Sequence, residues 1–113
     1  MLANLLDVFN ERDDAKRRAA IERTYANDVS WTDAEGVTSG WDALDAKCAG
    51  LQRGIAGQQF VPAGPVHQLP GFAYLAWRLE GGGADQPALS GFDVALISDG
   101  VITSLYTVLD GAA

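Results

Sequence analysis

Two aspartates occupy positions in this chain where a carboxylate could transfer protons. Asp93 lies inside the run 89–97 (LSGFDVALI), whose apolar, β-branched and aromatic residues are typical of a buried strand. A buried carboxylate is costly unless it is hydrogen-bonded, neutral or functional. Asp33 ends a second strand-like run, 28–33. If both acids point into one apolar cavity, one could shuttle a proton next to a carbonyl while the other stabilises the enolate.

Each aspartate also has a structural interpretation. Asp93 could accept hydrogen bonds from a backbone N–H or from the hydroxyl groups of Ser90 or Ser98. Asp33 begins the sequence DAEG (33–36), which is typical of a tight turn in which Asp bonds its own backbone. The strand around Asp93 offers apolar neighbours and no nearby Lys or Arg. We therefore expect the pKa of Asp93 to be raised.

Seven further residues could line a cavity for a flat hydrophobic ligand. On a strand, Trp31 points to the same side as Asp33. Trp77 aligns with Ala73, Leu75 and Leu79, and Leu105 aligns with Thr103, Thr107 and Leu109, in two rows predicted to face inward. The predicted lining comprises Tyr25, Trp31, Leu44, Cys48, Leu51, Trp77 and Leu105. Taken singly, such residues usually belong to packed core, so the prediction of a cavity rests on the set.

The remaining reactive side chains indicate no metal, cofactor or nucleophile site. His67 is the only histidine, and no Cys, His or carboxylate cluster lies near it in the sequence. Cys48 is the only cysteine, which excludes an internal disulfide, and its place on an apolar helix stripe is that of a small core residue. The glycines at 81–83 form a turn without the context of a phosphate-binding loop.

Size and charge indicate one acidic globular domain spanning residues 1–113. The net charge of −7 argues against binding to nucleic acid or to anionic membrane surfaces. The one basic cluster, Lys16 to Arg18, is interpreted as a solvated helix face because acidic residues surround it. No apolar run approaches the ~20 residues that span a bilayer, and acidic residues interrupt the apolar start. We expect a cytoplasmic protein.

Helical periodicity dominates the first half of the chain. Leu2, Leu5, Leu6 and Phe9 share one helix face. A second helix, capped by Asp13 or Asp14, turns Ala20, Ile21, Thr24 and Tyr25 inward. After a short strand near 29–32, Ser39 and Asp42 form the pattern of a capping box. They precede a third helix with the apolar stripe Trp41, Leu44, Cys48, Leu51 and Ile55.

Strand periodicity dominates the second half. Residues 59–61 and 66–69 flank a bend at PAGP (62–65), and 72–80 is a long strand. Residues 89–98 and 101–110 form a hairpin through Asp99-Gly100. Helices followed by antiparallel strands predict an α+β domain, with three N-terminal helices packed on one face of a curved, mostly antiparallel sheet.

This order of elements resembles the cone-shaped, cystatin-like fold of the nuclear-transport-factor-like superfamily. The matching segments are 25–33 (YANDVSWTD) with Gly36, 39–44 (SGWDAL) and 91–102 (GFDVALISDGVI). The superfamily includes ketosteroid isomerases, SnoaL-like polyketide cyclases, scytalone dehydratase and limonene-epoxide hydrolase. The resemblance covers essentially the whole chain and is more specific for fold than for reaction.

The resemblance also implies roles for individual residues. Asp33 falls where ketosteroid isomerases keep their proton-shuttling aspartate. Asp93 falls where those enzymes keep a protonated aspartate, and where SnoaL-like cyclases keep an acid/base aspartate. Phe9 takes the place of the isomerases' oxyanion tyrosine, and no partner histidine of the cyclases is evident. Thr107 replaces an aspartate that the epoxide hydrolases need beside an arginine such as Arg78, which argues against a hydrolase.

The sequence therefore favours a SnoaL-like protein with acid/base chemistry on a hydrophobic carbonyl compound, isomerase-like or cyclase-like, with Asp93 and Asp33 as catalytic residues. The alternative is a non-catalytic protein that binds an apolar metabolite or supports a partner. The outer row of the long strands, Phe72, Tyr74 and Ala76 with Tyr106 and Val108, is also apolar. Because no helix remains to cover it, we expect a homodimer packed through this face.

Overall fold

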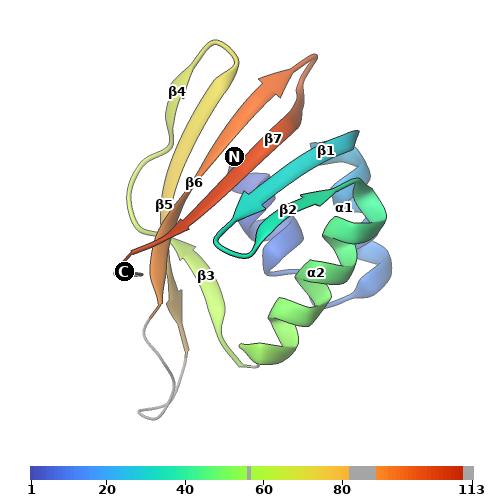
Figure 1. Cartoon of the computed structure of the whole chain (residues 1–113). Coiled ribbons are helices and arrows are strands. Elements are labelled where there is room, and N and C mark those ends of the chain that lie inside the picture. The colour runs from blue at the N-terminus through green and yellow to red at the C-terminus, as the bar shows by residue number, and fades with distance from the viewer. Residues whose placement is uncertain (56, 82–88, 111–113) are drawn as a thin grey trace.

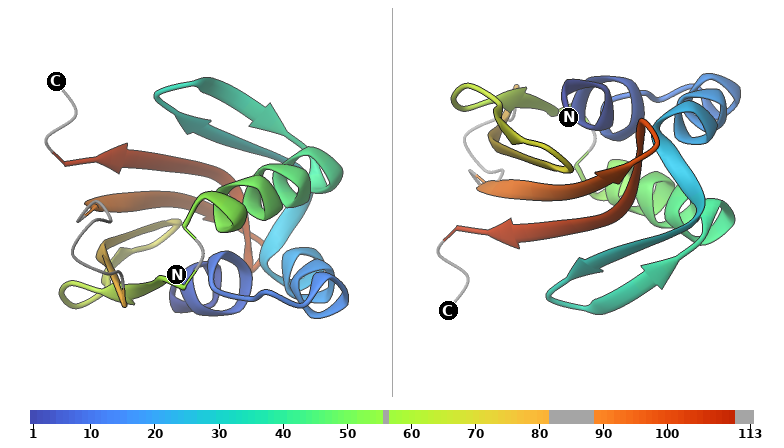
Figure 2. Two further views of the ribbon diagram at one scale, coloured as in Figure 1. Left: turned by 90° about the horizontal axis from the view of Figure 1, so that it is seen from below. Right: turned by 90° about the horizontal axis from the view of Figure 1, so that it is seen from above.

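A curved sheet bends around three helices in the computed structural model of this protein, which describes residues 1–55, 57–81 and 89–110 (Figure 1). Figure 2 shows the helices gathered on one side of the sheet, which confirms the predicted α+β architecture. The helices are η1 (Asn4–Phe9), α1 (Asp14–Thr24) and α2 (Trp41–Gly54). The strands are β1 (Tyr25–Asp33), β2 (Gly36–Ser39), β3 (Gln59–Pro62), β4 (His67–Leu69), β5 (Phe72–Glu80), β6 (Ser90–Ser98) and β7 (Val101–Leu109).

The sheet runs in the order β2-β1-β7-β6-β5-β3, and β4 also pairs with β5. Strands β1 and β7 are parallel, and all other pairs are antiparallel. Strand β3 pairs with the second half of β5, and β4 pairs with its first half. The bend predicted at 62–65 separates these two short strands. The turn predicted at 81–83 lies mostly outside the described residues.

The hairpin of β6 and β7 forms as the sequence predicts. Asp99 (φ 53°) and Gly100 (φ 80°) both adopt positive φ, the geometry of a tight two-residue turn that matches the twist of the strands. The pairing slips by one residue next to Leu96 and Ile97. Because of this bulge, Ile102 faces the core, and the prediction that Thr103 faces inward is wrong.

The first helix has π geometry, which changes the face it buries. The N–H of Asn10 donates to the carbonyl of Leu5, five residues back, at 3.1 Å. Bonding over five residues places side chains i and i+5 on the same side of the helix. The buried residues are Asn4, Leu5, Val8 and Phe9. Leu2 (46% exposed) and Leu6 (45%) lie outside, so the predicted apolar face is wrong at these two positions.

The starts of the two α-helices differ in how well the sequence predicts them. Asp13 caps α1, because its side chain accepts the N–H of Lys16 at 2.9 Å. The capping box predicted for α2 is absent. Ser39 pairs with Ser30 as the end of β2, a strand that the sequence analysis missed, and Gly40 (φ 86°) becomes the cap. Sheet pairing at Ser39 thus overrides the local capping pattern.

Arg17 joins the helices and is not part of a solvated face as predicted. Its side chain is 3% exposed and bonds Asp45 and Asp14, each at 2.6 Å, and the side-chain oxygen of Gln52 at 3.0 Å. The amide of Gln52 in turn donates to the carbonyl of Phe9 at 3.0 Å. Arg17 and Gln52 therefore hold the end of η1 against α2. No helix in the described part of the chain is long and apolar enough to cross a membrane.

Candidate functional site

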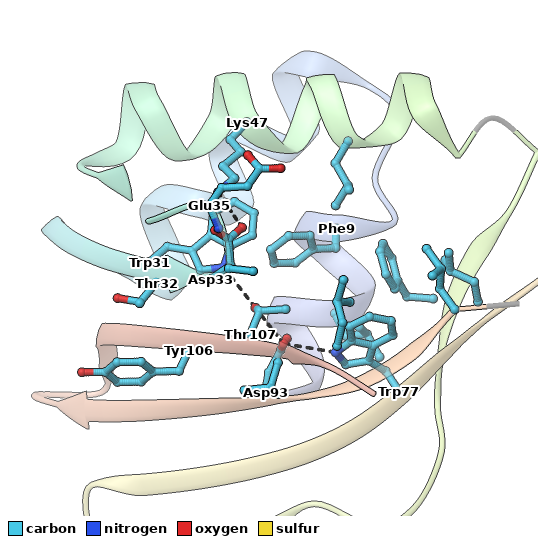
Figure 3. Close-up of a pocket in the computed structure, with 18 of the residues that line it drawn as sticks. Phe9, Trp31, Thr32, Asp33, Glu35, Lys47, Trp77, Asp93, Tyr106 and Thr107 are labelled. Atoms are coloured by element: carbon cyan, nitrogen blue, oxygen red, sulfur yellow. Dashed lines mark hydrogen bonds and ion pairs between the residues drawn. The ribbon is translucent and has the colours of Figure 1, made fainter. Parts of the chain in front are cut away.

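A cavity of about 490 Å³ lies between the helices and the inner face of the sheet. Its wall is mostly apolar, with a few polar groups on the side formed by β1, β6, β7 and α2 (Figure 3). The size and the mixture of many apolar and few polar groups are those of a small-molecule site. The lining residues are Leu5, Phe9, Trp31, Thr32, Asp33, Ala34, Glu35, Lys47, Leu51, Ile55, Phe60, Trp77, Leu79, Leu89, Asp93, Tyr106, Thr107, Val108 and Leu109.

Asp93 lies on this wall and is only 3% exposed. Its Oδ1 accepts hydrogen bonds from Trp77 Nε1 (3.1 Å) and Thr107 Oγ1 (2.9 Å), both drawn in Figure 3. Its Oδ2 accepts one from Asn4 Nδ2 at 3.0 Å. The donors to Asp93 are therefore Trp77, Thr107 and Asn4, and not the hydroxyl groups of Ser90 or Ser98 that the sequence suggests.

The pKa of Asp93 is raised to about 6, in the direction that the sequence predicts. Burial is the largest cause, because it penalises the charged carboxylate. The hydrogen bonds from Thr107, Trp77 and Asn4 oppose it by stabilising that charge. The group is therefore poised to gain or lose a proton near neutral pH, as a general acid or base must be.

The donors also define which oxygen of Asp93 remains available. The indole of Trp77 can only donate. Thr107 Oγ1 accepts the indole N–H of Trp31 at 3.0 Å, which leaves its own proton for Asp93. Each carboxylate oxygen has about two acceptor sites. Two donors occupy Oδ1 and one occupies Oδ2, so Oδ2 keeps one acceptor site beyond these contacts.

Asp33 lines the same cavity, but both of its carboxylate oxygens bond groups other than Asp93. Its Oδ2 lies 2.5 Å from Lys47 Nζ, and its Oδ1 accepts the backbone N–H of Glu35 at 2.9 Å. The second of these bonds is the turn interaction that the sequence suggested. Lys47 Nζ also lies 4.6 Å from the ring centre of Trp31, a cation–π contact. The two aspartates thus share one cavity without bonding each other.

Four aromatic rings form a continuous belt in the cavity wall. Phe9 contacts Trp31 edge-to-face at 5.1 Å and Phe60 at 6.0 Å between ring centres. Phe60 contacts Trp77 in the same way at 5.1 Å. Edge-to-face packing is the favourable arrangement for such rings, so the belt is a stable wall. Phe9 contributes a ring without a hydrogen-bond donor.

The structure separates the seven predicted lining residues into two groups. Trp31, Leu51 and Trp77 line the cavity. Tyr25, Leu44, Cys48 and Leu105 are at most 1% exposed and belong to the core around it. Burial raises the pKa of the Cys48 thiol to about 12, so the thiol stays protonated.

Sequence reasoning missed Asn4 and Lys47. Asn4 is 0% exposed and interrupts the apolar run at the start of the chain, a signal that the helical interpretation passed over. Lys47 belongs to the same helix as Leu51, one turn earlier, and thereby reaches the cavity. Arg78 pairs with Glu80 at 2.7 Å and does not line the cavity.

Gly91 gives the Trp77 indole the room it occupies beside Asp93. A Cβ atom at Gly91 would lie 2.2 Å from the carbonyl oxygen of Val108 and 2.9 Å from Cζ2 of Trp77. Both distances are shorter than real Cβ contacts allow. Trp77 pairs with Gly91 across β5 and β6, so this missing side chain sets the position of the indole.

The described residues offer no cluster for a metal ion, because no three His, Cys, Asp or Glu side chains among them come together. His67 is exposed on β4, and its ring lies 5.6 Å from that of Tyr74.

No protein-family model matches the sequence, and no curated protein matches it. Solved structures do. A proposed isomerase of the SnoaL-like family from Agrobacterium tumefaciens C58 is 25% identical and superposes with a TM-score of 0.86 over 97% of this chain and 93% of that chain. The chain has a SnoaL-like fold.

Two further structures share this SnoaL-like fold at lower identity. A proposed SnoaL-like polyketide cyclase from Jannaschia sp. CCS1 is 17% identical, with a TM-score of 0.76 over 93% of this chain and 81% of that chain. A Catenulispora acidiphila protein with a ketosteroid isomerase-like fold, in complex with trimethylamine, is 14% identical, with a TM-score of 0.74 over 94% and 81%. At these identities the similarity shows the fold, and one fold can support many activities.

Proposed function

We propose that this SnoaL-like protein is an enzyme that transfers a proton at the carbon next to the carbonyl group of a hydrophobic substrate, in an isomerase-like or cyclase-like reaction without a cofactor. Asp93 is the general acid/base. The observation that supports this most is the buried Asp93 carboxylate on the wall of an apolar cavity, with a pKa raised to about 6 and one acceptor site left at Oδ2. When the substrate reacts through an enolate, isomerisation and cyclisation both begin with removal of the proton next to the carbonyl group by a base.

The surroundings of Asp93 favour proton transfer by raising the basicity of its carboxylate and by fixing its orientation. Burial makes the carboxylate a stronger base than an ordinary aspartate, because it destabilises the charged form. Three hydrogen bonds hold the ionised carboxylate of Asp93 in one orientation. Its oxygen is therefore already positioned for proton transfer when the substrate binds. The aromatic belt and the aliphatic wall exclude water and hold the apolar body of the substrate.

Asp33 is the second candidate for acid/base work, at a different place in the cavity. To accept a proton from a substrate, its Oδ2 would have to exchange its contact with Lys47. Lys47 is a hydrogen-bond donor at this end of the cavity. We assign the Asp33–Lys47 pair to contact with the polar part of the substrate that lies away from Asp93.

A proton-exchange experiment tests the proposal without knowledge of the substrate. Hydrophobic ketones of varied ring number are incubated with the protein in D₂O, and NMR follows the loss of the protons next to the carbonyl. We expect exchange with the native protein and a loss of at least about 100-fold with Asp93→Asn, the usual contribution of a positioned general base. Asp99→Asn, in the exposed hairpin turn, is the matched control. Exchange that survives Asp93→Asn would contradict the role of Asp93.

Two observations favour the alternative of a non-catalytic binding protein. Three donors already bond the Asp93 carboxylate, and Phe9 offers no donor for an oxyanion. If the protein only binds its ligand, ketones that protect the native protein against thermal unfolding should protect Asp93→Asn equally well. Neither the native protein nor Asp93→Asn should then catalyse exchange of the ketone protons.

We also propose that a second copy of the chain covers the outer face of the sheet. Cross-strand register places three uncharged rows there, made of Phe72, Leu96 and Ser104, of Tyr74, Val94 and Tyr106, and of Ala76, Phe92 and Val108. Contiguous apolar patches larger than roughly a few hundred Å² are rare on monomeric proteins. Tyr106 and Val108 also line the cavity, so a partner on this face would lie beside the cavity mouth.

A further inference from the structure

Asn4 and Tyr25 form a buried polar pair behind Asp93. They are 0% and 1% exposed and do not line the cavity. The Tyr25 hydroxyl donates to Asn4 Oδ1, and Asn4 Nδ2 donates to Asp93 Oδ2. The three residues come from β1, η1 and β6, so the chain of bonds joins three distant segments of the sequence. Neither Asn4 nor Tyr25 can touch a ligand in the cavity, yet both connect to its acid.

We propose that Asn4 and Tyr25 are a positioning pair for Asp93. The Tyr25 hydroxyl fixes which way the Asn4 amide points, and the amide then holds Asp93 Oδ2 so that its remaining acceptor site serves the substrate. The role in catalysis rests on the proposed function, whereas the arrangement itself does not.

The chemistry of an amide explains why Tyr25 is needed. The oxygen and nitrogen ends of an Asn side chain have nearly the same shape, so packing alone does not choose between them. If the amide were reversed, its oxygen would face the ionised carboxylate of Asp93, and both groups could only accept. A hydroxyl that donates to Asn4 Oδ1 favours the observed orientation, which presents N–H groups to Asp93.

Tyr25 remains a donor throughout the working range of pH. Its pKa is raised well above the ordinary value, mainly by burial, and the nearby Cys48 and Asp93 add to the effect. The phenol therefore stays protonated while Asp93 titrates. Among the described residues, the charged groups that line the cavity with Asp93 are Asp33, Glu35 and Lys47. The hydrogen bonds that join Tyr25, Asn4 and Asp93 involve none of these three groups.

The π geometry of η1 is what allows Asn4 to take part. Asn4 and Phe9 lie five residues apart, the spacing that a π-helix brings to one side. Asn4 can therefore reach Asp93 while Phe9 joins the aromatic belt of the cavity. An α-helix would turn these two residues to different sides. Short π segments occur frequently at functional sites.

A double-mutant cycle on the pKa of Asp93 tests the pair. NMR titration of the Asp93 carboxyl carbon is carried out on the native protein, Tyr25→Phe, Asn4→Leu and the double variant. We expect Asn4→Leu to raise the pKa by about one unit, because the ionised form loses a donor. Tyr25→Phe should raise it by less, and the double variant should match Asn4→Leu alone. Tyr74→Phe, which removes an outer-face tyrosine hydroxyl, should leave the pKa unchanged.

Two outcomes would overturn the proposal. Additive effects of the two substitutions would mean that Tyr25 acts on Asp93 directly and not through Asn4. An unchanged pKa in Asn4→Leu would make Asn4 a structural core residue. If Asn4→Leu does not fold, Asn4→Asp keeps the shape, and its carboxyl group should share a proton with Asp93 and raise the upper titration midpoint. The titrations need no substrate. A failed ketone exchange assay would therefore refute the proposed function without changing the outcome of the test of Asn4 and Tyr25.

Discussion

Lys47 Nζ lies 2.5 Å from Asp33 Oδ2 and 4.6 Å from the ring centre of Trp31, so one ammonium group joins the turn after β1 to the aromatic wall of the cavity. Trp31 in turn donates to Thr107, which donates to Asp93. A continuous row of contacts therefore links the charged end of the cavity to its buried acid. Glu35 also lines this end, and the three charged residues sum to one negative charge.

This charge balance predicts which ligands the cavity selects. Among naphthalene compounds that carry a hydroxymethyl, an aminomethyl or a carboxyl group, we expect the carboxylate to bind most weakly. Glu35→Gln should improve its binding by about threefold, the scale of an exposed charge contact. Asp99→Asn changes the net charge equally but lies in the β6–β7 turn, and should have no such effect. Calorimetric titration that ranks the carboxylate first would instead assign Lys47 to anion recognition.

The raised pKa of Asp93 predicts a pH-dependent stability. Between about pH 4 and pH 6 the unfolded chain releases the proton of Asp93 while the folded protein still holds it, so the free energy of unfolding falls as pH rises through this window. Above it the penalty is constant, at about 3 kcal/mol for a shift of this size. Asp93→Asn removes the penalty, so its stability advantage over the native protein should be near zero at about pH 3.5 and largest above about pH 7.

Urea unfolding at several pH values measures this difference. The gain can be smaller than the full penalty, because the amide introduced by Asp93→Asn requires the Asn4 amide to reverse in order to keep every donor matched to an acceptor. A variant that is much less stable than the native protein at neutral pH would identify Asp93 as a structural hydrogen-bond acceptor.

Gly91→Ala should damage the site by pushing the Trp77 indole away from Asp93. The added methyl group would clash with Trp77 and with the Val108 carbonyl, and overpacking of this kind typically costs about 1–3 kcal/mol. Loss of the indole donor should also raise the pKa of Asp93 further. Tryptophan fluorescence reports the displaced indole, thermal unfolding reports the lost stability, and NMR titration of the carboxyl carbon reports the pKa of Asp93. Gly54→Ala, where the new Cβ meets nothing within 4 Å, is the control.

The outer face predicts a homodimer. Tyr106→Glu should dissociate it, because an unpaired charge buried at an interface is strongly unfavourable. Leu6→Glu introduces the same charge on η1, on the helix side of the sheet (Figure 2), at a side chain that is 45% exposed, and should leave the dimer intact. Light scattering distinguishes the two. A native protein that is monomeric, near 11.9 kDa at micromolar concentration, would refute the dimer.

Local sequence determined those features whose causes are local. The strand pattern in 72–80 predicted the long strand β5, the Asp99-Gly100 turn predicted the hairpin of β6 and β7, and helical spacing in α2 placed Leu44 and Cys48 in the core. Asp93 could be singled out because a carboxylate in an apolar strand needs a reason to be there. The direction of its pKa shift followed from the same argument.

The tertiary structure alone decided the partners of these residues. Asn4 reaches Asp93 across 89 positions of sequence, and Trp31 reaches Thr107 across 76. Ser39 paired with β1 and lost its capping role, and Arg17 found Asp45 and became buried. Periodicity shows which face of an element is buried, but hydrogen bonds between elements depend on how these faces meet in space. For this reason the sequence could single out the buried carboxylate of Asp93 but not the groups that donate hydrogen bonds to it.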